Sequence, residues 1–183
     1  ILSKIKAKDG VYSVLGNHDY SAYSNFPDSI QWQYVEELKQ RQENMGWDLL
    51  LDENVNIIRD DDTISLIGVE NISTHRAFLS YGSLQKAMQN ADGTYKILLS
   101  HDPTHWELEV KDNPEIDLML SGHTHAMQFS IFGWSPSSFI FKEVAGLFRH
   151  ENQYLYVNIG LGETVMKARI GTKPEITVIC LHG

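Results

Sequence analysis

The stretch Leu15-Gly16-Asn17-His18-Asp19 ends a short apolar run in a glycine, followed by an amide, an imidazole and a carboxylate. Two later stretches repeat this pattern: Leu98-Leu99-Ser100-His101-Asp102-Pro103 and Leu120-Ser121-Gly122-His123-Thr124-His125. Each predicts a strand that stops at a turn, with histidine or asparagine projecting from its end. Strand ends in a helix-covered sheet converge on one edge, where binding sites are built. We therefore expect the three stretches to form one metal site.

The composition indicates one globular domain over residues 1–183, of which 42% are hydrophobic. The formal net charge of -9 argues against binding to duplex nucleic acid, which needs a basic surface. Neither a signal peptide nor an apolar run long enough to span a bilayer is visible in the sequence. The single cysteine, Cys180, cannot form an internal disulfide, and we expect it to be buried in an apolar strand over 176–181.

Predicted strands and helices alternate up to His125. Residues 1–8 look like the end of a helix that Asp9-Gly10 stops. A longer helix is predicted from Asp28 or Ser29 to about Met45, with an apolar stripe made of Ile30, Tyr34, Val35, Leu38 and Met45. Further helices are predicted over 83–91 and 103–110, and strands over 11–15, 49–51, 55–58, 63–69, 96–100 and 116–120.

After His125 the pattern changes to short apolar stretches separated by Gly, Pro and Ser. We expect antiparallel strands over 129–132, 138–141, 154–158, 166–170 and 175–181. An α/β half followed by a β-rich half predicts a layered α+β sandwich.

His123 and His125 are two residues apart, so in an extended segment both imidazoles leave the same face. Placed in this way they can bind one cation or two neighbouring ones, and metal pairs about 3.5–4 Å apart are usual for phosphoryl hydrolysis. Gly122 permits a tight turn with positive φ before them, and His101 ends a separate strand in the same way. Four further histidines are better explained by solvent exposure or a local hydrogen bond than by metal binding: His75, His105, His150 and His182.

The turn at Asn17 has a functional and a structural interpretation. Its amide oxygen can bind a divalent ion without cancelling the charge of the ion, but asparagine also tolerates left-handed turn geometry after Gly16. If Asn17 is a ligand, its neighbour His18 faces the substrate instead, as a proton donor to the leaving oxygen. Asp19 is then available to orient His18.

Two acidic features are also open to structural explanations. Asp102 can hold the ring of a metal-binding His101, or it can cap the helix that starts at Pro103. The three aspartates of 60–62 could bind calcium, but no liganding spacing follows them. We interpret them as the solvated turn of a hairpin.

With Gly-Asn-His-Asp, Ser-His-Asp-Pro and Gly-His-Thr-His in this order, the chain resembles the calcineurin-like metallophosphoesterases over essentially all 183 residues. The resemblance implies an α/β/β/α-type sandwich with two divalent metal ions (Mn, Fe, Zn or Ni) and a metal-bridging hydroxide that attacks a small phosphomonoester or phosphodiester. It implies that Asn17, His101 and His123 bind one ion and that His125 binds the other. It makes His18 the general acid or transition-state stabiliser.

The chain looks closest to a bacterial branch of this family, whose members often carry an N-terminal membrane segment. Residues 160–162, Arg169 and residues 174–176 resemble the C-terminal strands of that branch. A membrane anchor upstream of Ile1 is therefore an expectation, and the compartment is otherwise open. The branch often continues its last histidine with Gly-Gly-Gln, whereas this chain has Ala126-Met127-Gln128.

Two motifs that the family places before Gly-Asn-His-Asp are missing here: Asp-x-His and Gly-Asp-x-x-Asp. They supply aspartates, one of which bridges the metals. The remaining ligands are neutral, and two divalent ions so close together repel strongly even at an effective dielectric of about 20. We therefore expect an N-terminally incomplete fragment without its first two βα units, which binds one ion weakly or none and is inactive alone. Its exposed sheet edge beside 11–15 predicts self-association.

Two other interpretations remain. A catalytically dead family member would act as a binding or scaffold module, although the retention of all five site residues argues against it: Asn17, His18, His101, His123 and His125. A single-metal site with a structural role is the third, and replacing His18 would then change no activity. Nucleotides, lipid or sugar-lipid head groups and cell-wall phosphodiesters all fit the expected substrate class.

Overall fold

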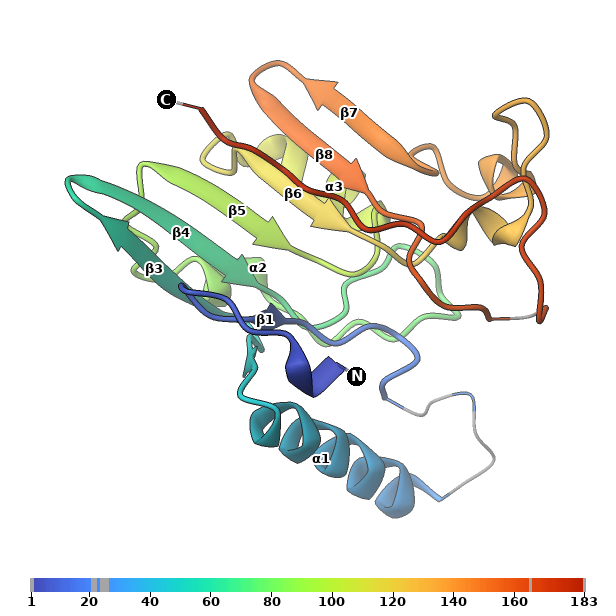
Figure 1. Cartoon of the computed structure of the whole chain (residues 1–183), viewed down its shortest axis with the longest axis horizontal. Coiled ribbons are helices and arrows are strands. Elements are labelled where there is room, and N and C mark those ends of the chain that lie inside the picture. Colours follow the sequence, from blue (N-terminus) through green and yellow to red (C-terminus); the bar gives the residue numbers. More distant parts are fainter. Residues whose placement is uncertain (1, 21–22, 24–26, 165, 183) are drawn as a thin grey trace.

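The computed structural model describes residues 2–20, 23, 27–164 and 166–182. Its main feature is a six-stranded sheet in the order β3-β4-β5-β6-β8-β7 (Figure 1). The four central strands run parallel, and the outer strands β3 and β7 run antiparallel to their neighbours. The strands are β3 (Glu53–Arg59), β4 (Asp62–Gly68), β5 (Tyr95–Leu99), β6 (Leu118–Ser121), β7 (Gly146–His150) and β8 (Gln153–Val157).

A second, two-stranded sheet pairs β1 (Tyr12–Ser13) with β2 (Asp48–Leu49) in parallel. Helix α1 (Asp28–Asn44) packs against it, and Leu15, Tyr20 and Val35 form a small core there. The two sheets touch at the end of β4. A Cβ atom at Gly68 would overlap the side chain of Leu50, which directly follows β2. This contact brings the turn after β1 close to the ends of the central strands.

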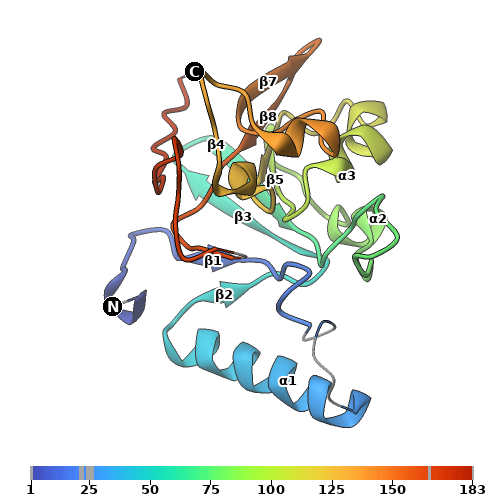
Figure 2. The same ribbon diagram turned by 90° about the vertical axis from the view of Figure 1, so that its right-hand side faces the viewer.

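Helices α2 (Leu84–Ala87) and α3 (Thr104–Leu108) cover one face of the large sheet (Figure 2). Strand β4 shows why: Ser65 and Ile67 are buried on this face, whereas Ile64 and Leu66 alternate onto the other face and are half-buried. The described part also contains four short 3₁₀ helices: η1 (Leu2–Lys4), η2 (Val110–Asp112), η3 (His125–Gln128) and η4 (Pro136–Phe139). The predicted α+β fold is confirmed, with helices on the outer sides of two sheets.

Strands β5 and β6 lie side by side in parallel, with Leu99 opposite Leu120. His101 follows β5 and His123 follows β6, so both histidines leave the large sheet at the same edge. Both strands are nearly continuous apolar runs, as expected for parallel strands covered on both faces. The predicted convergence of these strand ends is confirmed.

Some elements of the first half differ from the prediction. Helix α1 begins and ends as predicted, but Ile30 and Tyr34 of its expected apolar stripe are exposed, and Val35 and Gln42 are its buried residues. The predicted helix over 83–91 is a single turn that ends at Ala87 with Met88 as its C-cap, and Asn90, three residues beyond its end, adopts a positive φ. The predicted helix end at 1–8 is the 3₁₀ turn η1, and Ile1 lies outside the described residues.

The prediction for the β-rich half is wrong in detail. Residues 138–141 do not form a strand, because Pro136 starts η4, whose first turn is capped by the Ser135 hydroxyl. Strand β7 was not predicted, and β8 runs parallel to β6. Among the described strands of this half, the antiparallel arrangement therefore holds for the pair β7 and β8, besides an isolated antiparallel bridge between Ile131 and Trp134. Of the predicted strands over 129–132 and 166–170, the structure has an isolated bridge between Phe129 and Ile170.

The end of the chain is another correction. Residues 171–182 contain no strand, and Cys180 is exposed rather than buried. Side chains attach this segment to the large sheet: Glu175 bonds to the Tyr156 hydroxyl and Thr177 to Asn158. Apolar alternation predicts a strand only where a ladder partner is available, and no described strand pairs with this segment.

Gln153 should be a major polar contributor to the stability of the large sheet. Its side chain is 5% exposed, and its Nε2 lies 3.1, 2.8 and 3.0 Å from the carbonyl oxygens of Val110, Asn113 and Ile116. The carbonyls of Val110 and Asn113 also accept from the backbone amides of Asn113 and Ile116. Gln153→Ala thus removes the side-chain donor from all three carbonyls and, among the described residues, the one hydrogen-bond partner of the Ile116 carbonyl. We expect it to lower the free energy of unfolding by about 1–3 kcal/mol. Urea unfolding measures this loss, and the exposed Gln85→Ala serves as control. Equal stability of the two variants would contradict it.

Candidate metal centre

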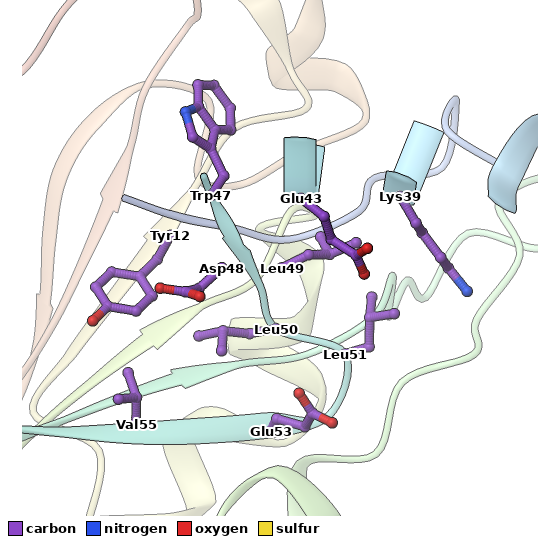
Figure 3. Close-up of a pocket in the computed structure, with 10 residues that line it drawn as sticks. All are labelled: Tyr12, Lys39, Glu43, Trp47, Asp48, Leu49, Leu50, Leu51, Glu53 and Val55. Atoms are coloured by element: carbon purple, nitrogen blue, oxygen red, sulfur yellow. The ribbon is translucent and has the colours of Figure 1, made fainter. Parts of the chain in front are cut away.

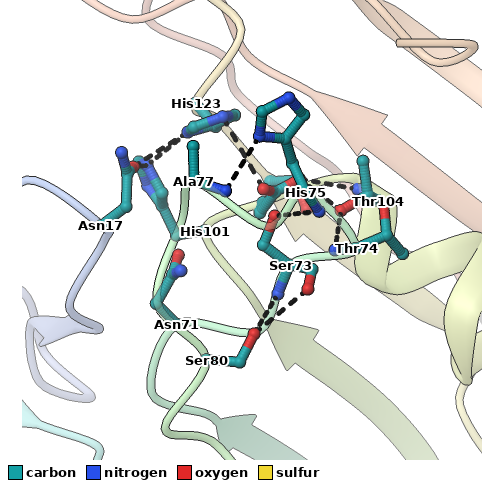
Figure 4. A network of polar contacts seen from close by, with 12 residues as sticks. Asn17, Asn71, Ser73, Thr74, His75, Ala77, Ser80, His101, Thr104 and His123 are labelled. Carbon is teal, nitrogen blue, oxygen red and sulfur yellow. Dashed lines mark hydrogen bonds and ion pairs between the residues drawn. The ribbon is translucent and has the colours of Figure 1, made fainter. Parts of the chain in front are cut away.

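The three strand-end stretches meet at one point on the edge of the sheet (Figure 4). Asn17 Oδ1 lies 3.0 Å from His101 Nε2 and 3.0 Å from His123 Nδ1, and the two ring nitrogens are 3.2 Å apart. We call these three atoms the donor triangle. Asn17 is only 1% exposed, so its side-chain amide lies away from bulk water.

The size of the donor triangle fits a metal ion. Nitrogen and oxygen ligands of zinc lie at about 2.0–2.2 Å, so neighbouring ligands of one ion are about 2.8–3.1 Å apart at an angle of about 90° and about 3.3–3.6 Å apart at a tetrahedral angle. Imidazole nitrogens suit Zn, Fe and Ni, and an oxygen donor also suits Mn. Among the described residues, no group of three or more His, Cys, Asp or Glu side chains could hold a metal ion. The donor triangle differs from such groups because it has two histidines and the amide of Asn17 as its third member, and it contains no carboxylate.

Gly16 lets Asn17 reach the donor triangle. A Cβ atom at Gly16 would lie 2.6 Å from the His101 ring, so glycine is needed for this close approach. The Asp19 carboxylate accepts a 2.7 Å hydrogen bond from the Gly16 amide and closes the turn. Asn17 Nδ2 donates to the Tyr23 hydroxyl at 2.7 Å, which turns Oδ1 toward the histidines. The φ of Asn17 is not positive, so its alternative interpretation as a left-handed turn residue is wrong.

The Asp102 carboxylate lies between the start of α3 and the ring of His123. Its Oδ1 accepts from the Thr104 amide at 2.9 Å and from the Thr104 hydroxyl at 2.8 Å, which agrees with the helix-capping interpretation. Its Oδ2 is buried, has no hydrogen-bond partner among the described residues, and lies 3.7 Å from His123 Nε2. His123 thus points one nitrogen at the donor triangle and the other toward a carboxylate. Carboxylates in this position orient metal-binding imidazoles.

The turn that carries His123 and His125 is strained at the histidines rather than at Gly122. His123 has a φ of 67° and His125 a φ of 47°, while Gly122 has no positive φ. The segment is therefore not extended, and the expectation that both imidazoles leave one face does not apply. Non-glycine residues in this region cost about 1–3 kcal/mol each, and they cluster at functional sites.

His125 is not part of the donor triangle. Its Nδ1 is buried and has no hydrogen-bond partner among the described residues. Burial, followed by the charge of Arg169, lowers the pKa of His125. Arg169 itself donates to the carbonyl oxygens of Ile159 and Gly160, which hold the loop beside the His125 ring. A buried ring nitrogen without a partner suits a ligand of a separate ion, and that role stays a prediction.

Burial keeps the imidazoles of the donor triangle neutral. It lowers the pKa of His101 to about 3, with His123 acting in the same direction and Asp102 opposing it. The pKa of His123 is also lowered, by burial first, again against the effect of Asp102. A neutral imidazole keeps the lone pair that a metal ion binds. Both imidazoles are therefore neutral at neutral pH, and each can offer a lone pair to a metal ion.

His18 lies on the open side of the site. It is exposed, its ring centroid is 4.7 Å from that of Tyr23, and its charge lowers the pKa values of His101, His123 and His125. This position suits a residue that faces substrate. Asp19 bonds to the Gly16 amide and to no imidazole among the described residues, so its predicted role in orienting His18 stays a prediction.

The sequence interpretation missed that the loop containing His75 belongs to the site. His75 is exposed, as expected, but the Phe78 ring lies 4.9 Å from its ring and 4.7 Å from the ring of His123. The Thr74 amide donates to Thr104 Oγ1 at 3.1 Å and ties the loop to the group that supports His123 (Figure 4). No motif marks this loop in the sequence, so only the fold could reveal it.

His105 forms a buried polar chain below the site. Its ring is fully buried and lies between Ser100 Oγ, at 3.0 Å from Nδ1, and Glu109 Oε2, at 3.1 Å from Nε2. The expected local hydrogen bond is confirmed, whereas the alternative of solvent exposure is wrong for this histidine.

A cavity of about 540 Å³ lies away from the metal centre, between α1, β2 and β3 (Figure 3). Leucines and Trp47 line it together with Lys39 and Glu43, and no residue of the donor triangle reaches it. The candidate site is therefore an open edge of the sheet rather than this cavity.

Comparison with known proteins identifies the family of this chain. The family model described as calcineurin-like phosphoesterase matches residues 1–127. The uncharacterized metallophosphoesterase YkoQ of Bacillus subtilis is 30% identical over 184 residues, which cover 96% of this chain and 62% of YkoQ. A Bos taurus transmembrane protein with a metallophosphoesterase domain is 31% identical, over 100% of this chain and 41% of that protein. UDP-2,3-diacylglucosamine pyrophosphatase LpxG of Chlamydia muridarum is 25% identical, over 99% of this chain and 67% of LpxG.

This chain thus spans less than two thirds of the first two relatives. Within the described residues, no helix is long and apolar enough to cross a bilayer. The matched range contains the whole donor triangle and His125. On the match to residues 1–127 and the similarity to YkoQ, the chain belongs to the calcineurin-like phosphoesterase family.

Proposed function

We propose that this chain carries the histidine-bearing part of a dinuclear metal centre that hydrolyses small phosphomonoesters or phosphodiesters. The donor triangle carries this proposal: three donors from three separate stretches lie within 3.2 Å of one another. Family membership supports a hydrolase that acts on phosphoric esters.

Each site residue has a distinct role in this proposal. Asn17, His101 and His123 would hold one divalent ion (Mn, Fe, Zn or Ni), and His125 would hold a second. When bound, such ions supply the Lewis acidity that polarises a phosphoryl oxygen and makes water more acidic. His18, on the exposed side, donates a proton to the leaving alcohol oxygen. Asp102 keeps Nδ1 of His123 directed at the donor triangle.

Charge limits how strongly the described donors can bind metal alone. An amide and three neutral imidazoles bring no negative charge to set against two divalent ions, whose repulsion is strong at this separation. We infer that carboxylates from outside residues 1–183 complete the site, and that this chain alone binds one ion weakly and is inactive. The shares of YkoQ and the bovine relative that the chain spans leave room for such residues.

The names of two relatives bear on the substrate and on the location of the protein. The name of LpxG supports a sugar-lipid phosphate among the expected substrates. The name of the bovine relative supports an attachment to membranes for the whole protein. Fractionation of the full-length protein between membrane and supernatant tests the second point.

Removing His123 tests the proposal. We would measure bound metal and bis(p-nitrophenyl) phosphate hydrolysis for this chain and for a version extended at its N-terminus. His123→Ala in the extended version should lose the metal held by the donor triangle and reduce hydrolysis by about a hundredfold or more, because a ligand is gone. His150→Ala, at the end of β7 away from the site edge, is the control and should keep both.

The same measurements decide between the alternatives. Hydrolysis that survives His123→Ala would contradict the site assignment. Metal binding without any hydrolysis in the extended version would instead favour a scaffold or structural site. In that case His18→Ala would leave every measured property unchanged.

A further inference from the structure

The loop that follows the histidine turn contains no charged residue. Between Asp117 and Lys142 there is no Asp, Glu, Lys or Arg, although 21% of the chain is charged. Residues 129–141 of this stretch, which we call the apolar loop, project at the edge of the large sheet where β5 and β6 end (Figure 1). A loop facing water normally carries polar or charged side chains.

The apolar loop exposes three large aromatic side chains and buries two of its serines, although Ser138 is exposed and Phe141 is buried. Phe132 is fully exposed, Phe139 is 81% exposed and Trp134 is 49% exposed. Ser135 and Ser137, by contrast, are 4% and 0% exposed, and their hydroxyls lie 2.7 Å apart. This is the reverse of the arrangement that burial of apolar surface favours in water.

The tip of the loop presents an aromatic ring where a small polar residue is normal. The backbones of Ile131 and Trp134 exchange hydrogen bonds of 2.9 and 3.0 Å around the two-residue turn Phe132-Gly133. Both turn residues have a positive φ, 50° for Phe132 and 82° for Gly133. Asparagine or aspartate is favoured at the first position of such turns. Turn geometry therefore gives no reason for phenylalanine at position 132.

The apolar loop is attached directly to the metal centre. Ser135 Oγ donates to the Ala126 carbonyl oxygen at 2.6 Å, next to His125. At the other end of the loop, Phe141 is buried and its ring lies 5.4 Å from that of His123. The foot of the loop is thus anchored in the histidine turn, while its tip points into the surroundings.

We propose that the apolar loop docks into the interfacial region of a lipid bilayer. Tryptophan and phenylalanine favour this region, and a loop without charges can enter it without desolvating an ion. The tip is a protruding turn, which suits insertion into a deformable medium better than contact with the flat surface of a protein. The loop is neutral in a chain of net charge -9, so its docking is apolar rather than electrostatic. This inference does not depend on the proposed hydrolysis, and it would bring the metal centre to the bilayer surface.

Binding to phosphatidylcholine vesicles tests the proposal with the chain itself. Co-sedimentation should show binding that about 0.5 M salt does not weaken, because no charge is involved. Phe132→Ser combined with Phe139→Ser should reduce the partition coefficient by about tenfold or more. The matched control combines Ile58→Ser with Leu147→Ser, at 67% and 63% exposure on other surfaces, and should bind within about twofold of the parent.

Tryptophan fluorescence locates the contact. Quenching by brominated lipid should disappear in Trp134→Phe and persist in Trp32→Phe, whose tryptophan is 46% exposed on α1. Absence of vesicle binding by the parent, or binding that the double variant of the apolar loop retains, would overturn the proposal. Binding only to anionic vesicles and only at low salt would also overturn it. If light scattering shows a dimer that the double variant dissociates, while vesicles are not bound, the loop contacts a second copy instead.

Discussion

Gly16→Ala is expected to abolish metal binding at the donor triangle and to lower the free energy of unfolding by about 1–3 kcal/mol. The added methyl group would lie 2.6 Å from Cγ and Cδ2 of His101, where carbon atoms need about 3.5–4.0 Å. His101 is held between the ends of the sheets, so the turn carrying Asn17 has to move away. That movement opens the donor triangle. Calorimetric titration of the N-terminally extended version with Mn²⁺ or Zn²⁺ measures the first effect, and urea unfolding of this chain measures the second.

Gly122→Ala is the matched control, because this glycine also precedes a site residue. A methyl group at Gly122 would meet only the Asn158 carbonyl oxygen at 3.8 Å, an ordinary contact, and Gly122 has no positive φ. We expect it to keep metal affinity and stability close to those of the parent. If both variants bind metal equally, the close approach of Gly16 to His101 does not determine the site.

The meeting of the three stretches could be predicted from the sequence because strand ends are encoded locally, whereas the choice of Asn17, His101 and His123 as ligands of one ion came from the family resemblance. Each of the three stretches combines an apolar run with a breaking turn, and parallel strands deliver their carboxyl ends to one edge. The structure indeed brings Asn17, His101 and His123 together. What local pattern could not give is the direction of each side chain. Asp102 turns to His123 rather than to His101, and the strain falls on His123 rather than on Gly122.

Contacts between loops that are far apart in the chain could not be predicted from the sequence. His75 lies in a loop with no motif, and its link to His123 runs through Phe78, 45 residues before that histidine in the chain. The burial of His105 and the exposure of Cys180 likewise depend on which distant segments pack against each residue, so they could not be predicted locally. The prediction for the β-rich half was wrong for the same reason, since a strand needs a neighbouring strand to pair with, and hydrophobic alternation does not specify that neighbour.

Acid is expected to destabilise the metal-free chain at a pH well above the usual range of its carboxylates. The pKa of His101 falls from an ordinary 6.5 to about 3 in the folded chain, chiefly through burial. Above pH 6.5 the His101 imidazole is neutral in both the folded and the unfolded chain, and it no longer makes the free energy of unfolding depend on pH. Below it, the unfolded chain binds a proton that the folded chain does not, so the free energy of unfolding falls with pH. One such group contributes about 1.4 kcal/mol per pH unit, or about 2 kcal/mol between pH 6.5 and pH 5.

Other groups define the window in which this effect is visible. The pKa of His123 is lowered as well, so it adds to the loss. The pKa values of Asp19 and Glu143 are raised by burial, and their protonation favours the folded state as the pH approaches the carboxylate range. The interval from pH 7 to about pH 5 therefore separates the histidines from the carboxylates.

Urea unfolding at pH 7 and pH 5 in the presence of EDTA measures the acid effect. The parent should be less stable at pH 5, and His101→Gln, which cannot bind this proton, should show a smaller loss; His123→Gln serves as a second variant. Unchanged stability of the parent between the two pH values would contradict the prediction. A metal ion at the donor triangle binds the same neutral nitrogens that acid would protonate. Metal bound by the N-terminally extended version should therefore stabilise the fold against acid, since ion and proton compete for one pair of ring nitrogens.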